Sequence, residues 1–426
     1  MESSHIADAS ITYSDEQLLR KRGYQFIKQL GEGSYAKVYL TNHEQSGRPD
    51  ATLACKVINA RKAPREFVTK FLPRELDIIG KVAHPNIIHI AAIFHIEHKF
   101  LIFMRYAENG DLLEYILRKG EVKESVARVW LYQLSLALQY LHVLDIAHRD
   151  IKCENVLISA NYNIKLADFG FARFVALSGR QVMSTTYCGS LIYASPEIIK
   201  GKPYFPKCSD VWSLGIVTYI MLNKTMPFSE SNSRQLYKLQ MAQQWSFRRR
   251  ILPALTQGIV AMVTKMLEPN FKARVTIDDI LQDVYFKEAA LEMTETEKAA
   301  LNFAVRHKSE LQHAKSFDMA DIANTHEQAK EAYTSTVIVS ADSRVAVDQP
   351  ETTAVQGVTT VPEVTTVQEP TTTQEPTDFS FIIKAVTERE MAHVAENDQP
   401  IDVEQMGTNS PPAASQLDSK MEIALQ

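Results

Sequence analysis

The sequence predicts an α+β protein of two lobes, a small β-rich amino-terminal lobe and a larger helical lobe, followed by an acidic tail. Short apolar segments typical of strands fill residues 24–104, and helical periodicity begins at Leu112. Within the helical part, Val156–Ser159 and Ile164–Ala167 flank an Asn-rich turn and predict a β-hairpin. From about Thr334 the chain is rich in Thr, Val, Pro and Glu. Strands followed by helices indicate an α+β layout.

These shifts divide the chain into four parts. We expect a flexible lead-in over residues 1–23, one folded domain over 24–287, a helical extension or linker over 288–333, and a low-complexity, disordered tail over 334–426. The apolar island Phe379–Ile383 in the tail could bind the folded domain or a partner, although a chance cluster is the favoured explanation.

Charge is distributed unevenly along the chain. Residues 301–426 contain 8 Lys and Arg against 20 Asp and Glu, a net charge of −12. Because the whole chain has a net charge of −5, residues 1–300 have a net charge of +7. A mildly basic folded part suits an enzyme that handles polyphosphates. It lacks the concentrated basic patch expected of a protein that binds nucleic acid.

The sequence contains no pattern for export or membrane insertion. The amino terminus has no signal-peptide pattern, and no apolar run is long enough to span a bilayer. The four cysteines, Cys55, Cys153, Cys188 and Cys208, occur singly, which argues against a disulfide framework or a zinc site. We therefore expect a cytoplasmic protein without a membrane partner.

Residues 24–40 predict two strands joined by a glycine-containing turn. Gly31 and Gly33 have no side chains, so the backbone amides there can approach phosphate oxygens closely. Ala36 occupies the position of an expected third glycine and is small enough to be tolerated. A dinucleotide-binding fold would need a helix directly after the glycines, whereas a strand follows here.

The next strand, residues 53–59, is apolar except for Lys56. A lysine in a buried strand is costly unless it is paired. The amphipathic helix predicted over residues 67–79 offers Glu75 as the partner. A snorkelling surface lysine would be the simpler explanation if this pattern stood alone.

The following segments complete the two lobes. Residues 87–94 and 100–104 predict two more strands, and residues 106–111 predict a turn that links the lobes. Residues 126–141 are apolar on nearly all sides, which is typical of a buried central helix.

Charged and polar side chains that could serve in catalysis are concentrated in two segments. These are the loop at residues 147–155, A-H-R-D-I-K-C-E-N, and the D-F-G at 168–170. The hairpin between them reverses the chain, so we expect Asn155 and Asp168 to converge. Asp150 and Lys152 then lie in the same cleft, and hard oxygen ligands of this kind suit a magnesium ion that carries phosphates. A loop of satisfied polar residues near a buried hairpin is the disfavoured alternative.

Together these motifs resemble those of eukaryotic protein kinases over about residues 24–287. The resemblance continues through Y-A-S-P-E at 193–197, where the family usually has A-P-E, and through S-D-V-W-S-L-G at 209–215. It implies a bilobal protein kinase fold in which Arg274 pairs with Glu197. The wording H-R-D-I-K resembles serine/threonine kinases.

Several shorter motifs resemble the testis-specific serine/threonine kinases of the calcium/calmodulin-dependent kinase-like group. These are K-A-P at 62–64, F-L-P-R-E at 71–75, G-D-L-L-E at 110–114, D-F-G-F-A at 168–172 and S-T-T-Y-C-G-S at 184–190. This resemblance implies male germ cells as the place of action.

The resemblance implies transfer of the γ-phosphoryl group of ATP to protein Ser or Thr hydroxyls with Mg²⁺. Asp150 would orient the hydroxyl and take its proton, Lys152 would neutralise the γ-phosphate, and Glu75 would hold Lys56 on the α- and β-phosphates. Asn155 and Asp168 would bind the metal. The implied ATP site comprises Leu30, Gly31, Glu32, Gly33, Ser34, Tyr35, Ala36, Lys37, Val38, Ala54, Lys56, Met104, Arg105, Ala107, Asp111 and Leu157. The implied apolar spine between the lobes comprises Ile79, Ile90, His148 and Phe169.

The loop after the D-F-G suggests regulation. A phosphate on Thr186, added by an upstream kinase, would neutralise cations that include Arg149, and an ordinary loop threonine is the alternative. Ser190 is expected to bond Asp150 and Lys152.

Substrate preference follows from the acids beside the peptide groove. Glu154 and Asp111 suggest a basic residue three before the phosphorylated position. Ile220 replaces an acid that some basophilic kinases use, so we expect one required arginine rather than two. Arg306–Ser309 fits this pattern by composition, which chance explains equally well.

Two other function classes compete with a protein kinase. A pseudokinase signalling scaffold would have lost Lys56, Asp150, Asn155 or Asp168, and all four are present. A kinase of small molecules is disfavoured by the long segment between Asp168 and Glu197.

Overall fold

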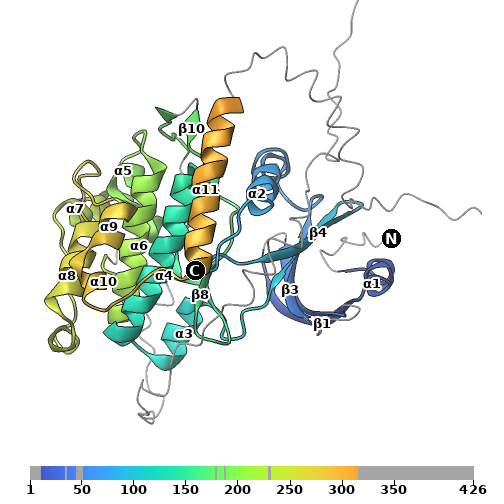
Figure 1. Ribbon diagram of the computed structural model, residues 1–426, viewed down its shortest axis with the longest axis horizontal. Helices are drawn as coiled ribbons and strands as arrows, with labels where there is room; N and C mark the ends of the chain where they lie inside the picture. Colours follow the sequence, from blue (N-terminus) through green and yellow to red (C-terminus); the bar gives the residue numbers. More distant parts are fainter. Residues whose placement is uncertain are drawn as a thin grey trace, which may run out of the picture.

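The computed structural model describes residues 11–33, 36–44, 51–177, 180–186, 189–228 and 232–314. Ser34, Tyr35, Tyr187, Cys188 and the tail predicted from residue 334, with its island Phe379–Ile383, lie outside these ranges. The described chain forms a β-rich amino-terminal lobe and a helical carboxyl-terminal lobe, as expected (Figure 1).

The small lobe is built on a five-stranded antiparallel sheet in the order β1-β2-β3-β5-β4. Its strands are β1 (Tyr24–Glu32), β2 (Ala36–His43), β3 (Ala51–Asn59), β4 (Ile90–Ile96) and β5 (Lys99–Arg105). In β3, Cys55, Val57 and Ile58 are fully buried, so the strand that carries Lys56 is the rigid centre of this lobe.

The helix expected over residues 67–79 forms in two pieces. A π-helical turn spans Phe67–Phe71, and α2 spans Leu72–Ile79 with Pro73 in its first turn. Proline is favoured at that position because the amide it lacks has no helical partner there. Leu72, Leu76 and Ile79 are buried, and Glu75 lies on this same inward side.

The large lobe packs around two helices that are buried for most of their length, α4 (Glu124–Val143) and α6 (Pro206–Asn223). The surrounding helices are α3 (Leu112–Lys119), α5 (Pro196–Ile199), α7 (Ser233–Met241), α8 (Gln257–Met266), α9 (Ile277–Gln282) and α10 (Val284–Lys287). Among the described residues, no helix has both the length and the apolar character that crossing a bilayer requires.

Three two-stranded ribbons lie outside this sheet. They pair β6 (Ile146–Ala147) with β9 (Arg173–Phe174), β7 (Val156–Ile158) with β8 (Ile164–Leu166), and β10 (Ala176–Leu177) with β11 (Arg180–Gln181). The β7–β8 ribbon is the hairpin expected from the sequence.

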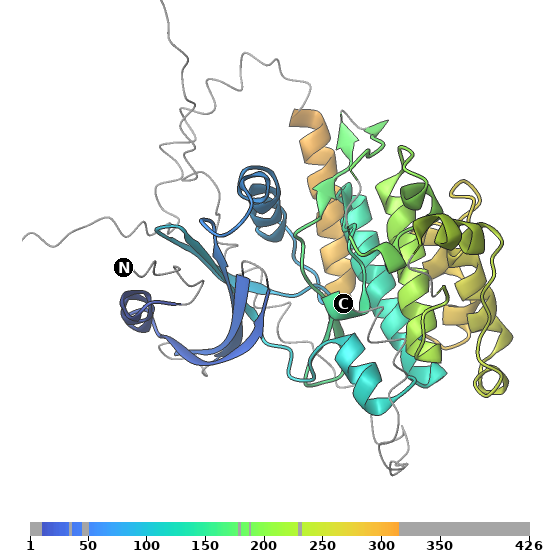
Figure 2. The same ribbon diagram turned by 180° about the vertical axis from the view of Figure 1, so that it is seen from behind.

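The structure differs from the expected flexible lead-in over residues 1–23. Tyr13–Arg20 form α1, and Thr12 and Asp15 form a reciprocal capping box at its start. Leu19 is fully buried, and Lys99 at the start of β5 donates to Asp15 Oδ2 over 2.6 Å. The helix lies beside β1 (Figure 2), so residues 11–22 belong to the folded lobe.

Part of the expected extension over residues 288–333 is also a packed helix. α11 (Glu295–Ala314) lies along α4 in both views (Figures 1 and 2). Ala300 and Ala304 are buried in the shared core, and Lys308 Nζ lies 3.2 Å from both carboxylate oxygens of Asp145.

The Asp15–Lys99 ion pair makes the anchoring of α1 testable. Asp15→Asn is expected to lower the free energy of unfolding by about 3 kcal/mol, because the buried ammonium of Lys99 loses its counter-charge. Burial alone would raise the pKa of Asp15, but hydrogen bonds from Lys99 and Thr12 lower it below its ordinary 3.8. The contribution is therefore complete at neutral pH and is lost as the pH falls through the lowered pKa.

Denaturant unfolding of both proteins, followed by circular dichroism at pH 7 and in the acidic range, measures this difference. Glu66→Gln is the matched control, because Glu66 and Lys70 form an exposed pair at 3.0 Å, and its effect should stay within about 0.5 kcal/mol. An equal loss in both variants, or a difference that persists at low pH, would contradict the assignment.

Candidate active site

The loop at residues 147–155 is held from below by one buried carboxylate on α6. Asp210 Oδ2 accepts the backbone N–H of His148 at 2.9 Å, and Asp210 Oδ1 accepts that of Arg149 at 2.8 Å. Arg149 has a φ of 66°, a left-handed conformation that costs a non-glycine residue free energy. The two hydrogen bonds offset that cost and fix the position of the next residue, Asp150.

Asp150 lies at the centre of a small polar cluster. Lys152 Nζ is 3.0 Å from Asp150 Oδ2. Asn155 Nδ2 donates to the carbonyl of Asp150 at 2.8 Å and to its Oδ2 at 3.0 Å. Asp150 is buried, so its carboxylate has one fixed orientation.

The β7–β8 hairpin brings Asp168 back to this cluster. Val156 pairs with Leu166, and the N–H of Ala167 donates to the carbonyl of Asn155 at 2.8 Å. Asp168 follows with a φ of 58°. The structure therefore brings together the segments of Asn155 and Asp168, as the hairpin pattern predicted.

Lys56 connects the two lobes. Its Nζ lies 2.9 Å from Glu75 Oε1 on α2 and 3.1 Å from Asp168 Oδ1, so the ion pair expected between Lys56 and Glu75 is present. Burial alone would lower the pKa of Lys56, but the two carboxylates outweigh burial and raise it above its ordinary value. The charge of Lys56 lowers the pKa of Asp168, against the opposing effect of burial. At neutral pH the site therefore presents a charged ammonium and a charged carboxylate.

The residues expected around the nucleotide base lie on neighbouring strands. Val38 pairs with Lys56, Ala54 pairs with Met104, and Leu157 forms an isolated bridge with Asp111. Leu30, Gly31 and Glu32 lie at the end of β1, the N–H of Gly33 donates to the carbonyl of Ala36 at 2.7 Å, and Lys37 follows in β2. Ser34 and Tyr35 lie outside the described residues.

Two residues expected to contact the nucleotide, Arg105 and Asp111, already make hydrogen bonds within the protein. The N–H of Arg105 donates to the carbonyl of His89 at 2.9 Å, so this N–H is not available to the base. Asp111 caps α3 by accepting the N–H of Glu114 at 2.8 Å, a role that sequence reasoning missed. Burial raises the pKa of Asp111. Ala107 is buried directly after the sheet.

The donor set fits a hard divalent ion. Both hydrogens of the Asn155 amide point toward Asp150, which leaves the amide oxygen as a ligand. Asp168 uses Oδ1 for Lys56 and for the N–H of Gly170, which leaves Oδ2. One carboxylate and one amide oxygen suit Mg²⁺, which takes few protein ligands and completes its shell with phosphates and water. In the described part of the chain, no group of three His, Cys, Asp or Glu could hold a metal by itself.

The structure brings together two members of the expected apolar spine and forms the ion pair expected in the large lobe. The rings of His148 and Phe169 meet edge to face with centroids 5.0 Å apart, and Ile79 and Ile90 belong to the same apolar cluster. Arg274 binds Glu197 through two parallel hydrogen bonds of 2.8 and 3.0 Å.

The hydrogen bonding of Arg149 and the exposure of Thr186 bear on the phosphate predicted at Thr186. The Nε of Arg149 donates to the carbonyl of Phe171 at 2.8 Å, and its buried Nη1 has no hydrogen-bond partner among the described residues. Thr186 has an exposed side chain, and its carbonyl accepts the hydroxyl of Tyr204 at 3.0 Å. Arg74 and Arg173 line a cleft between α2 and β9, and sequence reasoning missed both.

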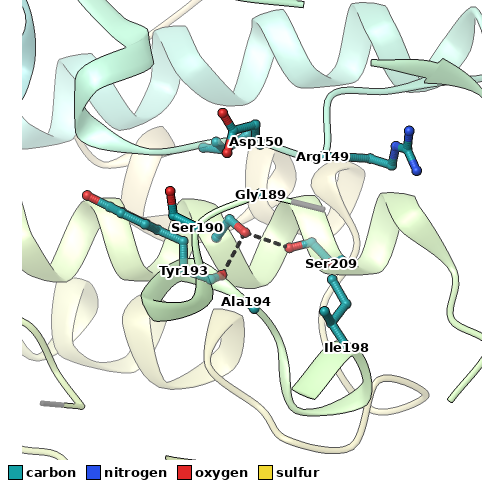
Figure 3. Close-up of a pocket in the computed structure, with 10 residues that line it drawn as sticks. Arg149, Asp150, Gly189, Ser190, Tyr193, Ala194, Ile198 and Ser209 are labelled. Carbon is teal, nitrogen blue, oxygen red and sulfur yellow. Dashed lines mark hydrogen bonds between the residues drawn. The ribbon is translucent and has the colours of Figure 1, made fainter. Parts of the chain in front are cut away.

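The expected peptide side of the site lies under the segment after Gly189. Figure 3 shows a small pocket in which Ser190 lies between Asp150 and Tyr193. The hydrogen bonds expected from Ser190 to Asp150 and Lys152 do not form in the described structure, where Lys152 and Asn155 are the partners of Asp150 Oδ2. Glu154 is bonded by the hydroxyl of Tyr193 at 3.2 Å.

Comparison with known proteins agrees with this geometry. Residues 24–286 match the family model described as "Protein kinase domain". Testis-specific serine/threonine-protein kinase 1 of Mus musculus is 41% identical over 279 residues, 65% of this chain and 75% of that protein. Testis-specific serine/threonine-protein kinase 3 of Homo sapiens is 36% identical over 266 residues, 62% of this chain and 96% of that protein.

NUAK family SNF1-like kinase 2 of Rattus norvegicus is 38% identical over 262 residues, which are 62% of this chain and 40% of that protein. The match to the protein kinase family model extends over more than half of the chain and includes Lys56, Glu75, Asp150, Asn155 and Asp168. The chain therefore belongs to the protein kinase family and is a serine/threonine kinase of the calcium/calmodulin-dependent kinase-like group.

Proposed function

We propose that this kinase transfers the γ-phosphoryl group of ATP to Ser and Thr hydroxyls of proteins, and that it acts in the cytoplasm of male germ cells. The observation that carries the proposal is the contact of Lys56 with both Glu75 and Asp168, at 2.9 and 3.1 Å. It joins the small lobe to the segment that follows β8, so the charged side chains that phosphoryl transfer requires lie in one site.

Each group has a task that its surroundings support. Lys56, steadied by Glu75, binds the α- and β-phosphates, and Lys152 offsets the charge of the γ-phosphate. Asp150 accepts a hydrogen bond from the substrate hydroxyl, orients it, and receives its proton as the bond to phosphorus forms. Because a carboxylate is a weak base, orientation contributes more than basicity. Asn155 and Asp168 would hold Mg²⁺, whose positive charge would offset the negative charge of the phosphates.

The peptide side favours a basic residue. Glu154 is partly exposed next to Asp150, and Asp111 lies near it at the start of α3. In an extended peptide bound at this side, these carboxylates would be positioned to bind an arginine three residues before the acceptor. Ile220 is fully buried in α6, which supports a requirement for one arginine rather than two.

Phosphorylation of Thr186 by an upstream kinase is the proposed switch. Among the described residues, the buried Nη1 of Arg149 has no hydrogen-bond partner. Arg173 pairs with Ala147, two residues before Arg149. Arg74 faces the same cleft from α2. A phosphate among these cations would join α2, β9 and the catalytic loop through charge-assisted hydrogen bonds. Arg306–Ser309 lie in α11, where an extended substrate conformation would require the helix to open, so self-phosphorylation there is disfavoured.

Asp150→Asn tests whether the protein transfers phosphate. The unmodified protein, incubated with ATP, Mg²⁺ and a serine peptide, should label the peptide, and the variant should be at least about 100-fold slower. Binding of an ATP analogue, measured by thermal shift, should be kept in both. Mass spectrometry locates the phosphate. Nucleotide binding without transfer by the unmodified protein would instead favour the pseudokinase scaffold.

Thr186→Ala tests the switch. The variant should lose about tenfold or more in kcat relative to protein already phosphorylated at Thr186, because no phosphate can engage Arg149. Thr185→Ala is the matched control, since Thr185 is an exposed neighbour, and it should keep full activity. Unchanged kcat in Thr186→Ala would end this part of the proposal.

A further inference from the structure

Tyr193 connects the two segments that flank the peptide side of the site. It ends a single 3₁₀ turn, Leu191–Tyr193, and Ser213 on α6 donates to its carbonyl at 2.9 Å. From this anchored backbone the ring reaches beside Ser190 on the side of the pocket away from Arg149 (Figure 3). Its hydroxyl meets the catalytic loop at Cys153 and Glu154.

The direction of the hydroxyl proton follows from these contacts. The oxygen of Tyr193 accepts the backbone N–H of Cys153 at 3.4 Å, so its own proton points away from that amide. Glu154 Oε2, 3.2 Å away, is the acceptor it meets. Burial raises the pKa of Tyr193, and the hydroxyl therefore stays a donor throughout the neutral range.

Glu154 needs such a partner. A glutamate side chain has several rotatable bonds, and ordering it when a substrate binds costs conformational entropy. The tyrosine is bonded to the same acid that would meet the substrate.

We propose that Tyr193 is a positioning residue for substrate selection, whose hydroxyl holds Glu154 in the orientation that receives the basic side chain three residues before the acceptor. This inference rests on the proposed preference for a basic residue at that position. It adds that the preference depends on a residue outside the catalytic loop.

The test compares two serine peptides that differ only in arginine or alanine three residues before the acceptor. Tyr193→Phe removes one oxygen and keeps the ring. It should raise KM for the arginine peptide roughly 3- to 10-fold, the range expected for a lost hydrogen bond to a charged group. Its kcat and its KM for the alanine peptide should stay within about twofold, because Asp150 and Lys56 are untouched.

Two further variants separate positioning from a structural effect. In a Glu154→Gln background, Tyr193→Phe should cause no additional loss of preference, since both changes remove the same interaction. Tyr219→Phe is the matched control: Tyr219 is a buried tyrosine on α6 whose hydroxyl donates to Ser246 at 2.8 Å, and it should leave both peptides unaffected.

Three outcomes would overturn the inference. An equal loss for the arginine and alanine peptides would show a structural role only. An unchanged arginine preference in Tyr193→Phe would refute the inference and leave the proposed preference intact. If the unmodified protein phosphorylates both peptides equally, the proposed preference for a basic residue fails, and the inference fails with it.

Discussion

The buried carboxylate of Asp210 is the contact on which the rest of the site depends. It accepts the backbone N–H groups of His148 and Arg149, and it also lies 3.0 Å from the ring Nε2 of His142 on α4. A buried carboxylate is costly unless it is fully hydrogen-bonded, and the left-handed backbone at Arg149 is costly unless its surroundings impose it. The hydrogen bonds between Asp210 and the loop offset both costs, so the loop and α6 form one unit.

The remaining parts of the site follow from that fixed loop. Asp150 comes next in the chain, and Asn155 bonds back to it before the β7–β8 hairpin returns Asp168 to the same place. Lys56 then binds Asp168 from the other lobe, and α2 must lie inward for Glu75 to reach it. The part of the site on the catalytic loop is therefore held by α6, whereas the contact of Lys56 with Glu75 depends on the position of α2.

Sequence alone located the charged centre because its signals are local. A lysine in an apolar strand requires a partner, and a short hairpin requires its two ends to meet, which is why Lys56 with Glu75, and Asn155 with Asp168, could be predicted. Asp210 and Tyr193 could not be assigned roles, since the partners that define those roles are 39 to 68 residues away in sequence and no periodicity relates them. The role of α1 had a readable signal, the capping box of Thr12 and Asp15, together with a lysine that opens an apolar strand. What sequence could not supply was that this lysine, Lys99, lies against Asp15.

The most direct measurement of this account is kcat in Asp210→Asn. An amide at this position keeps the size of the side chain but offers one acceptor oxygen where two N–H donors wait, so Arg149 and Asp150 should shift. We expect kcat to fall by about 100-fold, as displacement of a catalytic group by about 1 Å can cause, while an ATP analogue still binds because its phosphates meet Lys56 on β3. Asp278→Asn, a change to an exposed aspartate that bonds Gln139, should have no effect. A normal kcat in Asp210→Asn would contradict the claim that this carboxylate sets the position of the catalytic loop.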